Sequence, residues 1–225
     1  MNQTPQHLGI IMDGNRRWAE KKGLPVFEGH KKGAQVLEDT VRQAKKKGIK
    51  TLTVFAFSTE NWQRPEREVN FLMDLGKKTL GRDFRRLAKE NIKINIIGQR
   101  ERLPKAIQAS FKSIEHFTKK NNGMALNIAL SYGGRAEIVD AMRQMIKNKI
   151  KPEEITEDVI GQNLWTSDLD LLIRTGREQR ISNFLIWQAA YSELYFCPKY
   201  WPDFSEKDLD QALQEYSLRQ RRRGK

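Results

Sequence analysis

The sequence predicts an α/β fold in which a mainly parallel central sheet is flanked by helices. Short apolar segments alternate with longer amphipathic ones, no repeat or flexible linker interrupts the 225 residues, and 38% of them are hydrophobic. A chain of this size buries roughly 70–75% of the surface that its unfolded form exposes. Parallel neighbours need a crossover, which is usually helical. We therefore expect a single domain over residues 1–225.

The short apolar segments predict strands, because several are rich in β-branched or aromatic residues. In chain order they are residues 8–12, 52–57, 92–97, 126–130, 169–173 and 194–196. Apolar residues at steps of three and four predict helices over 34–44 and 69–87. Further helices are expected near 102–120, 134–148, 156–164, 183–191 and 205–216.

Cysteine and motif content excludes several classes of protein. Cys197 is the only cysteine, which excludes an intramolecular disulfide and a multi-cysteine metal site and fits a reducing compartment. No pair of histidines has the spacing of zinc ligands, and neither a P-loop nor a GxGxxG motif follows a predicted strand. No membrane span or signal peptide is expected. We expect a cytoplasmic protein.

The net charge of +13 indicates anionic partners. Residues 219–225 form a basic tail without an acid, yet the rest of the chain is also basic. Nucleic acid is disfavoured, because the basic residues are not interleaved with aromatics and no RNA or DNA fold signature is present. We expect the tail to contact anionic lipid at the inner face of the membrane, peripherally, and the body to bind phosphorylated small molecules.

Ligands of parallel sheets bind at the carboxyl ends of the strands. The segments that follow the predicted strands are residues 13–17, 58–62, 99–100, 132–135 and 174–177. They are dominated by arginine, glycine and small polar residues, with two acids. This composition suits a phosphate or diphosphate, with a carboxylate left for a divalent cation.

Each candidate also has a structural interpretation. Asp13 is either a helix N-cap or a functional carboxylate, and the glycine and arginines at 14–17 favour a phosphate cradle. Residues 58–68 are either a binding loop or a capping segment before the next helix.

The arginine-rich residues 174–183 predict an oxyanion site at the start of the helix expected over 183–191, with a solvated basic loop as the alternative. Glu193 is either a charge at the end of that helix or a metal ligand, and its unfavourable sign there favours a ligand. His30 alone is typical of a cap or surface residue.

Three segments, taken in order and spacing, resemble the cis-prenyltransferase family, most closely its bacterial undecaprenyl diphosphate synthases. They are residues 7–19, 57–69 and 174–193, with the cores Asp13-Gly14-Asn15, Ser58-Thr59-Glu60-Asn61-Trp62 and Arg174-Thr175-Gly176. Residues 131–135 and 201–204 match as well, so that the resemblance covers nearly the whole chain.

The resemblance implies homodimers, a parallel sheet flanked by helices, an apolar tunnel for the growing chain and a requirement for Mg²⁺. It implies repeated condensation of isopentenyl diphosphate onto an allylic diphosphate, usually farnesyl diphosphate, with each new double bond Z. The expected product is undecaprenyl diphosphate for cell wall biogenesis and peptidoglycan synthesis.

The same resemblance implies the site residues. Asp13 is expected to hold Mg²⁺ and assist departure of the allylic diphosphate, and Glu193 to share the metal across the dimer. Residues expected to bind the allylic diphosphate are Gly14, Asn15, Arg16, Arg17 and His30. Those expected to grip isopentenyl diphosphate are Arg174, Arg180 and Ser182. Ser58, Asn61, Trp62, Arg64 and Glu68 line the junction, and Trp18, Thr59, Glu60 and Ile181 complete the substrate-binding set.

Asn61 occupies the family's candidate position for proton removal. A carboxamide is hardly basic, so we expect Asn61 to orient the substrate or a water that relays the proton. Candidate tunnel-lining residues are Ala56, Phe57, Leu72, Leu126 and Leu130, each of which could equally be ordinary core. The polar segment 76–81 is expected to move or to open for lipid release.

Two positions depart from the family's pattern. Val26 stands where an arginine commonly precedes the Gly-His pair, and Arg177 replaces a glycine. Arg16 also replaces a glycine, which relocates a cation. A left-handed backbone at 177 would cost an arginine roughly 1–2 kcal/mol, and we expect altered diphosphate affinity. A non-catalytic subunit is a further alternative, against which the presence of Asp13, Arg174, Arg180 and Glu193 argues.

Overall fold

The computed structural model describes residues 4–219, apart from the side chains of residues 80–85. Within this part of the chain, six strands form one parallel sheet in the order β3-β4-β2-β1-β5-β6. The strands are β1 (His7–Ile11), β2 (Thr51–Ser58), β3 (Lys93–Ile97), β4 (Ala125–Tyr132), β5 (Leu171–Arg174) and β6 (Glu193–Phe196). The expected single-domain α/β fold with a parallel sheet is confirmed.

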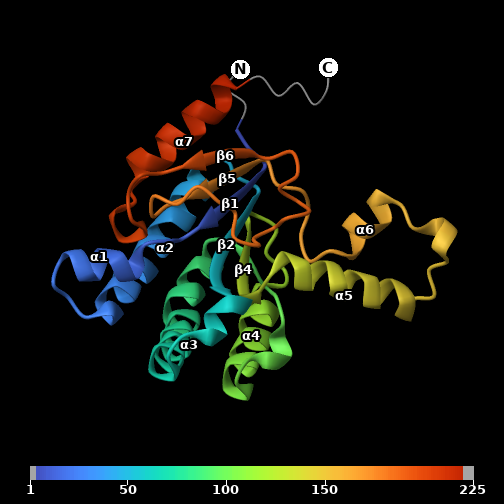
Figure 1. Ribbon diagram of the computed structural model, residues 1–225, viewed down its shortest axis with the longest axis horizontal. Coiled ribbons are helices and arrows are strands. Elements are labelled where there is room, and N and C mark those ends of the chain that lie inside the picture. The colour runs from blue at the N-terminus through green and yellow to red at the C-terminus, as the bar shows by residue number, and fades with distance from the viewer. Residues whose placement is uncertain (1–3, 220–225) are drawn as a thin grey trace.

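Helices connect most of these strands (Figure 1). They are α1 (Asn15–Lys21), α2 (Val26–Lys46), α3 (Glu66–Lys89), α4 (Lys105–Thr118), α5 (Gly134–Lys147), α6 (Glu157–Asn163) and α7 (Glu206–Leu218), with a short 3₁₀ helix η1 (Thr59–Gln63) after β2. Only the N-cap interpretation of Asp13 indicated α1, whose seven residues give little periodicity. The N-cap is Gly14 instead, without a side-chain cap. Helix α2 also begins well before the expected residue 34.

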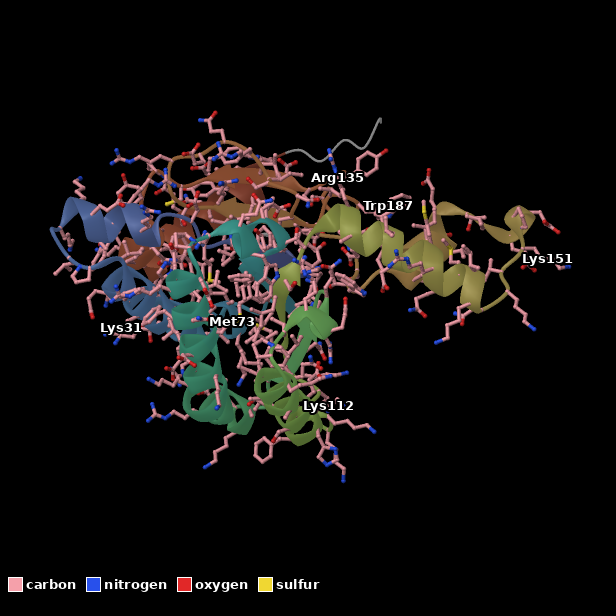
Figure 2. The ribbon with its side chains drawn as sticks, turned by 60° about the horizontal axis from the view of Figure 1, so that its bottom comes forward. Lys31, Met73, Lys112, Arg135, Lys151 and Trp187 are labelled. Carbon is pink, nitrogen blue, oxygen red and sulfur yellow. The ribbon has the colours of Figure 1, made fainter. Side chains whose placement is uncertain are left out.

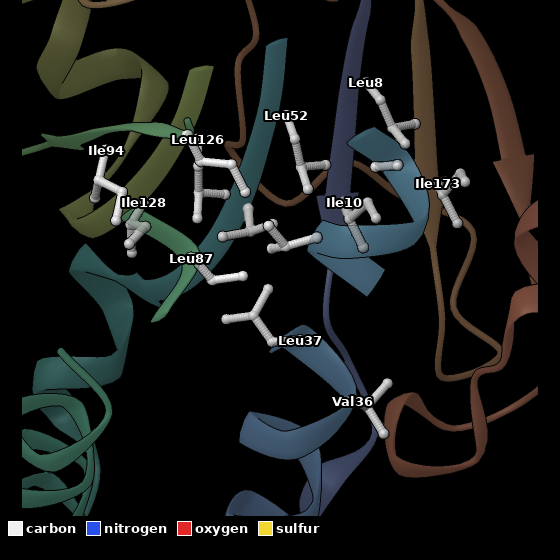
Figure 3. Packing of buried hydrophobic residues seen from close by; sticks show 14 of the residues in the cluster. Leu8, Ile10, Val36, Leu37, Leu52, Leu87, Ile94, Leu126, Ile128 and Ile173 are labelled. Atoms are coloured by element: carbon white, nitrogen blue, oxygen red, sulfur yellow. The ribbon is translucent and has the colours of Figure 1, made fainter. Parts of the chain in front are cut away.

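The two faces of the sheet carry different apolar clusters, because alternate strand residues point to opposite sides. The larger cluster joins Ile10 and its neighbours in the sheet to α2, α3, α4 and α7, while Ile11 belongs to the smaller one. Figure 3 shows Leu37 of α2 and Leu87 of α3 among strand residues such as Leu126. Each fully buried aliphatic side chain contributes about 1.5–3 kcal/mol, which fixes α2 and α3 beside the carboxyl ends of β1 and β2.

Helices α5 and α6 extend away from the other helices as an arm, residues 134–163 (Figure 1). Figure 2 shows Lys151 at its far end and Arg135 at its root. Val139, Met142 and Ile146 share one face of α5, because they are three and four positions apart. They are 46%, 51% and 77% exposed. The arm therefore carries an apolar stripe that the chain itself leaves uncovered.

A buried carboxyl group anchors the root of the arm. Glu137 accepts hydrogen bonds from the Trp165 backbone N–H at 2.7 Å and from Gln188 Nε2 at 3.0 Å, and Tyr132 donates to it as well. Burial raises the pKa of Glu137 despite these bonds. The network ties the arm to the segment that precedes β6.

The prediction of a helix over 183–191 is wrong. Residues 182–191 form turns and bends, and Ser182, Asn183 and Leu185 have φ values of 49°, 63° and 46°. The Asn183 carbonyl accepts from the Gly134 N–H at 2.7 Å, and Asn183 Oδ1 accepts from the Arg135 N–H at 3.0 Å. These tertiary bonds outweigh the helical periodicity. The expected oxyanion site at a helix start after Ser182 is therefore absent.

In the described part of the chain, no helix is both long and apolar enough to cross a membrane.

Candidate functional site

The neighbouring strands β1 and β5 bring Asp13 and Arg174 together, although 161 positions separate them. A glycine makes the approach possible. Gly176 has a φ of 90°, and a Cβ atom there would lie 2.9 Å from Arg17 Nη2 and 3.0 Å from Asp13 Cβ. Glycine at 176 therefore satisfies both a left-handed backbone and a close contact between the two loops.

Asp13 is held between two guanidinium groups. Its Oδ1 pairs with Arg17 Nη2 at 2.9 Å and its Oδ2 with Arg174 Nη2 at 2.9 Å. The Arg174 side chain is 5% exposed, whereas that of Asp13 is 28% exposed. Arg174 Nη1 also donates to Ser182 Oγ at 2.7 Å and to the Arg180 carbonyl. Buried Arg174 thus fixes the carboxylate at the carboxyl edge of the sheet.

Glu178 links two of the arginines. It pairs with Arg17 Nη1 at 2.9 Å and with Arg180 Nη1 at 2.6 Å. Partial burial opposes the charged form of Arg17, but the hydrogen bond and charge of Asp13 raise its pKa. The set Asp13, Arg17, Arg174, Glu178 and Arg180, here the Asp13 group, holds more guanidinium groups than carboxylates and suits an anion.

Thr175 and Glu178 are site residues to which the sequence analysis assigned no role. Thr175 Oγ1 donates to the Asp13 carbonyl at 2.7 Å. Both lie inside the 174–183 motif. An acid between arginines was the feature of the sequence that could have identified Glu178 as a site residue. Segment 99–100 stays apart, since Arg100 pairs with Glu115 of α4 at 2.6 Å.

A second cluster, the His30 group, joins His30 of α2 to Arg64 and Glu68. Arg64 Nη1 lies 3.1 Å from Glu68 Oε1, and His30 Nε2 lies 3.7 Å from the same oxygen, too far for a hydrogen bond. Burial, followed by the charge of Arg64, lowers the pKa of His30 to about 4. His30 is thus neutral at pH 7, and its buried Nε2 has no hydrogen-bond partner among the described residues.

Asn61 belongs to a capping box in η1. Its Oδ1 accepts from the Ser58 N–H at 3.0 Å, while its own N–H donates to Ser58 Oγ at 3.3 Å. Trp62 Nε1 donates to Ser131 Oγ at 2.9 Å, and its ring meets Phe57 edge-on. Residues 58–61 therefore cap η1 itself and fix the orientation of the Asn61 carboxamide, whereas α3 begins after Pro65 without a side-chain cap.

Other predicted substrate residues surround these clusters. Glu60 Oε1 accepts from Asn183 Nδ2 at 3.1 Å, and the Thr59 hydroxyl packs close to Gly133. Arg16 is exposed and pairs with Glu20 at 2.8 Å.

Two predicted residues face elsewhere. Trp18 Nε1 donates to Asp203 at 2.7 Å, and Ile181 packs against the smaller apolar cluster. No hydrogen bond or ring contact links either one to the Asp13 group in the part of the chain described. Their substrate-binding role stays a prediction.

Glu193 lies far from Asp13 within one chain. It begins β6 opposite Leu171, toward the amino end of the sheet, and pairs with Arg219 at 2.8 Å. Asp13 follows the carboxyl end of β1. The expectation that the two share a metal therefore requires a second copy of the chain and stays a prediction.

An apolar cavity of about 140 Å³ lies between the sheet and helices α2, α3 and α4. Four of the five expected tunnel residues line it, namely Ala56, Phe57, Leu72 and Leu130. Leu126 instead packs in the core. Asn15 and His30 also line it, so the cavity meets the His30 group.

The residues present fit a divalent cation that arrives with a diphosphate. Among the described residues, no three His, Cys, Asp or Glu side chains converge into a metal site. Mg²⁺ is commonly bound by one or two carboxylates together with substrate phosphates and water. The partly exposed carboxylate of Asp13, inside a cationic cluster, matches that kind of site.

Comparison with known proteins identifies the family. A family model described as putative undecaprenyl diphosphate synthase matches residues 11–224. The chain belongs to this family. Isoprenyl transferases from Thermotoga maritima and Streptococcus pneumoniae are 48% and 47% identical to it, with 99% of this chain and 97% and 92% of theirs aligned.

Solved structures agree with the family. Lavandulyl diphosphate synthase from Lavandula x intermedia, in complex with dimethylallyl diphosphate, has a TM-score of 0.95 at 39% identity, covering 99% of both chains. A probable undecaprenyl diphosphate synthase from Campylobacter jejuni has a TM-score of 0.86 at 32% identity, covering 100% of both. The family resemblance of the sequence is confirmed, and the chain is a prenyltransferase of isoprenoid biosynthesis.

Proposed function

We propose that this prenyltransferase condenses isopentenyl diphosphate repeatedly onto farnesyl diphosphate and makes undecaprenyl diphosphate, the lipid carrier precursor of the cell wall. The observation that carries the proposal is an apolar cavity lined by Met12, Asn15 and His30, residues that stand beside Asp13 of the cationic Asp13 group in the chain or belong to the His30 group. Guanidinium groups suit two diphosphates, and the cavity suits an isoprenoid tail.

In each condensation, the bond between the allylic carbon and its diphosphate oxygen breaks as the terminal alkene carbon of isopentenyl diphosphate forms the new carbon–carbon bond. A proton then passes from C2 of the isopentenyl unit through water to the released diphosphate, and the Z double bond forms. Negative charge grows on the leaving diphosphate. Arginines that Asp13 already aligns stabilise it without reorganising, and one such donor is typically worth about 3–4 kcal/mol.

The proposed binding roles cut across the two clusters, because Arg17 of the Asp13 group and His30 bind the same diphosphate. Asn15, Arg16, Arg17 and His30 bind the allylic diphosphate, while Arg174, Arg180 and Ser182 bind isopentenyl diphosphate. Asp13 would hold Mg²⁺, which supplies Lewis-acid neutralisation of the leaving group when bound.

Asn61 positions the isopentenyl unit rather than removing its proton, because a carboxamide is hardly basic and its Oδ1 is already bonded to the Ser58 N–H. Asn61→Ala removes the carboxamide, and Ser58→Ala breaks the same capping box without removing it. A larger loss of turnover in Asn61→Ala is expected. Equal losses would leave Asn61 with a structural role only, and near-normal turnover would remove it from the mechanism.

The deciding experiment sizes the products made from farnesyl diphosphate, labelled isopentenyl diphosphate and Mg²⁺. Products of undecaprenyl length are expected. A cavity of roughly 150 Å³ holds one benzene-sized guest, so long products require the cavity to enlarge during elongation. Chains that stop after one or two additions would reassign the product class, and a lack of incorporation would overturn the proposed activity.

We propose a homodimer in which a second copy covers the apolar stripe of the arm. Ile146 is 77% exposed and lies on the same helix face as Met142. Light scattering should give a dimer mass for the native chain and a monomer mass for Ile146→Glu. A native monomer would refute this assembly.

The basic tail, residues 219–225, is proposed to contact anionic lipid. Apart from Arg219, these residues lie outside the described part of the chain. Binding to anionic vesicles should be weakened by salt and lost on deletion of the tail. Binding that survives the deletion would contradict this role.

A further inference from the structure

Arg177 has a backbone conformation that favours glycine. Its φ is 67°, in the left-handed region that a Cβ atom disfavours. Its side chain is nevertheless fixed, because Nε donates to the Pro198 carbonyl at 3.0 Å and Cζ lies 5.4 Å from the centre of the Tyr200 ring. The strained backbone is therefore combined with a defined side-chain position.

The Tyr200 ring also makes a cation–π contact with a guanidinium group of the candidate site. Arg17 Cζ lies 5.6 Å from the ring centre. The ring packs tightly on Gly14, since a Cβ atom there would come within 2.6 Å of Tyr200 Cδ1. Arg17 in turn pairs with Asp13 at 2.9 Å. The place of the ring thus limits the positions open to Arg17.

Backbone hydrogen bonds join the three loops involved. The Gly176 N–H donates to the Lys199 carbonyl at 2.7 Å, and the Trp201 N–H donates to the Asp13 carbonyl at 3.0 Å. Arg177 itself lies outside the Asp13 group. It lines a separate cavity of about 360 Å³ with Trp18 and lysines, and no described carboxylate forms an ion pair with it.

We infer that Arg177 is a positioning residue for the reaction, which clamps Tyr200 and thereby holds Arg17 in its pair with Asp13. The inference rests on the proposed function, since its main readout is prenyl transfer. Cation–π contacts and the fixed planar fork of arginine explain why this side chain suits the task.

The test is Arg177→Gly. Glycine adopts the left-handed conformation at position 177 without strain, so Tm should stay level or rise by up to about 4 °C. Released from the clamp, Tyr200 and Arg17 lose their fixed geometry. The kcat should fall about tenfold and KM for the allylic diphosphate, which Arg17 binds, should rise, with little change in KM for isopentenyl diphosphate. A merely structural residue would move Tm and kcat together. Arg177→Lys should recover part of kcat, because an ammonium group keeps the cation–π contact without the fork.

Two further variants sharpen the test. Tyr200→Ala should lower kcat about as much as Arg177→Gly, and the double variant should lose no more than Tyr200→Ala alone. Lys149→Gly is the matched control, because Lys149 is an exposed cationic residue with a φ of 58° at the end of α5. It should keep Tm level or raise it and leave kcat unchanged.

The outcomes separate this inference from the proposed function. Wild-type kcat in Arg177→Gly, or additive losses in the double variant, would overturn the role of Arg177. Failure of the native enzyme to incorporate isopentenyl diphosphate would overturn the proposed function instead. In that case, an unchanged NMR signal of the Arg17 Nε–Hε group in Arg177→Gly would overturn the clamp itself.

Discussion

The Asp13 group and the His30 group lie near the same edge of the sheet but differ in how their charges are paired. Asp13 is fixed by two guanidinium groups at 2.9 Å each. His30 is largely buried and neutral, and its Nε2, 3.7 Å from Glu68, has no hydrogen-bond partner in the described part of the chain. Groups fixed where charge develops stabilise a transition state, whereas a group that contacts the ground state and the transition state equally changes only KM. We therefore expect the first group to control kcat and the second to control KM.

The largest expected effect is that of Asp13→Asn. Loss of this charge releases Arg17 and Arg174 and removes the carboxylate proposed for Mg²⁺, so kcat should fall about 10³-fold. The measurement is the initial rate of labelled isopentenyl diphosphate incorporation. Asp210→Asn, which removes a remote carboxylate paired with Lys47, is the control. A loss of less than tenfold in Asp13→Asn would contradict the assigned role.

Arg174→Lys should lower kcat about 10²-fold and also lower Tm. An ammonium group cannot bond Asp13, Ser182 and the Arg180 carbonyl together in the geometry of the guanidinium fork. The same exchange in the His30 group, Arg64→Lys, should cost less than tenfold in kcat. Equal losses in the two variants would remove the distinction between the groups.

Val26→Arg should lower KM for the allylic diphosphate roughly two- to fivefold and leave kcat nearly constant. Val26 begins α2 and stands four positions before His30, on the same side of the helix. A guanidinium group there adds a cation beside the His30 group. Val26→Gln, a polar neutral variant, is the control. An unchanged KM in Val26→Arg would show that this departure from the family pattern is neutral.

The smallest expected effect concerns the dependence of stability on pH. The pKa of His30 is lowered by burial to about 4, against about 6.5 in the unfolded chain. The unfolded state therefore binds more protons between these values, so this histidine makes stability fall as pH drops from about 6.5 to about 4. Titration of this one group changes the free energy of unfolding by at most about 1.4 kcal/mol per pH unit.

Thermal unfolding measured at pH 7.5 and pH 5 should show a smaller loss of Tm in His30→Gln than in the native chain. His7, whose pKa burial also lowers, remains in both proteins and serves as the internal reference. Identical losses would mean that His30 is not held neutral by its surroundings.

Local patterns predicted the elements well where one face of each element is buried. All six expected strands form, and the apolar residues at 69–87 do belong to a helix. The segment 182–191 could not be predicted, because distant partners fix it. Asn183 bonds to the start of α5 and to Glu60, and no local pattern encodes those bonds.

The candidate site was predictable to the extent that parallel strands bring their carboxyl ends together. That rule places Asp13 near Arg174. The rule does not bring Glu193 to this edge. Its strand β6 is parallel to the others, but Glu193 is the first residue of that strand and lies at the amino end. The role of Asn61 in a capping box and the contact of Arg177 with Tyr200 also depend on side-chain geometry that the spacing of motifs does not contain.

The wall of the apolar cavity is also part of the hydrophobic core. Leu37, Met73, Phe111 and Ile128 line the space and belong to the large apolar cluster. Under the proposed function, a lengthening hydrocarbon must push apart side chains whose mutual contacts keep α3 and α4 on the sheet. Each added isoprene unit then costs packing contacts of the native fold, and this cost limits the length of the proposed product.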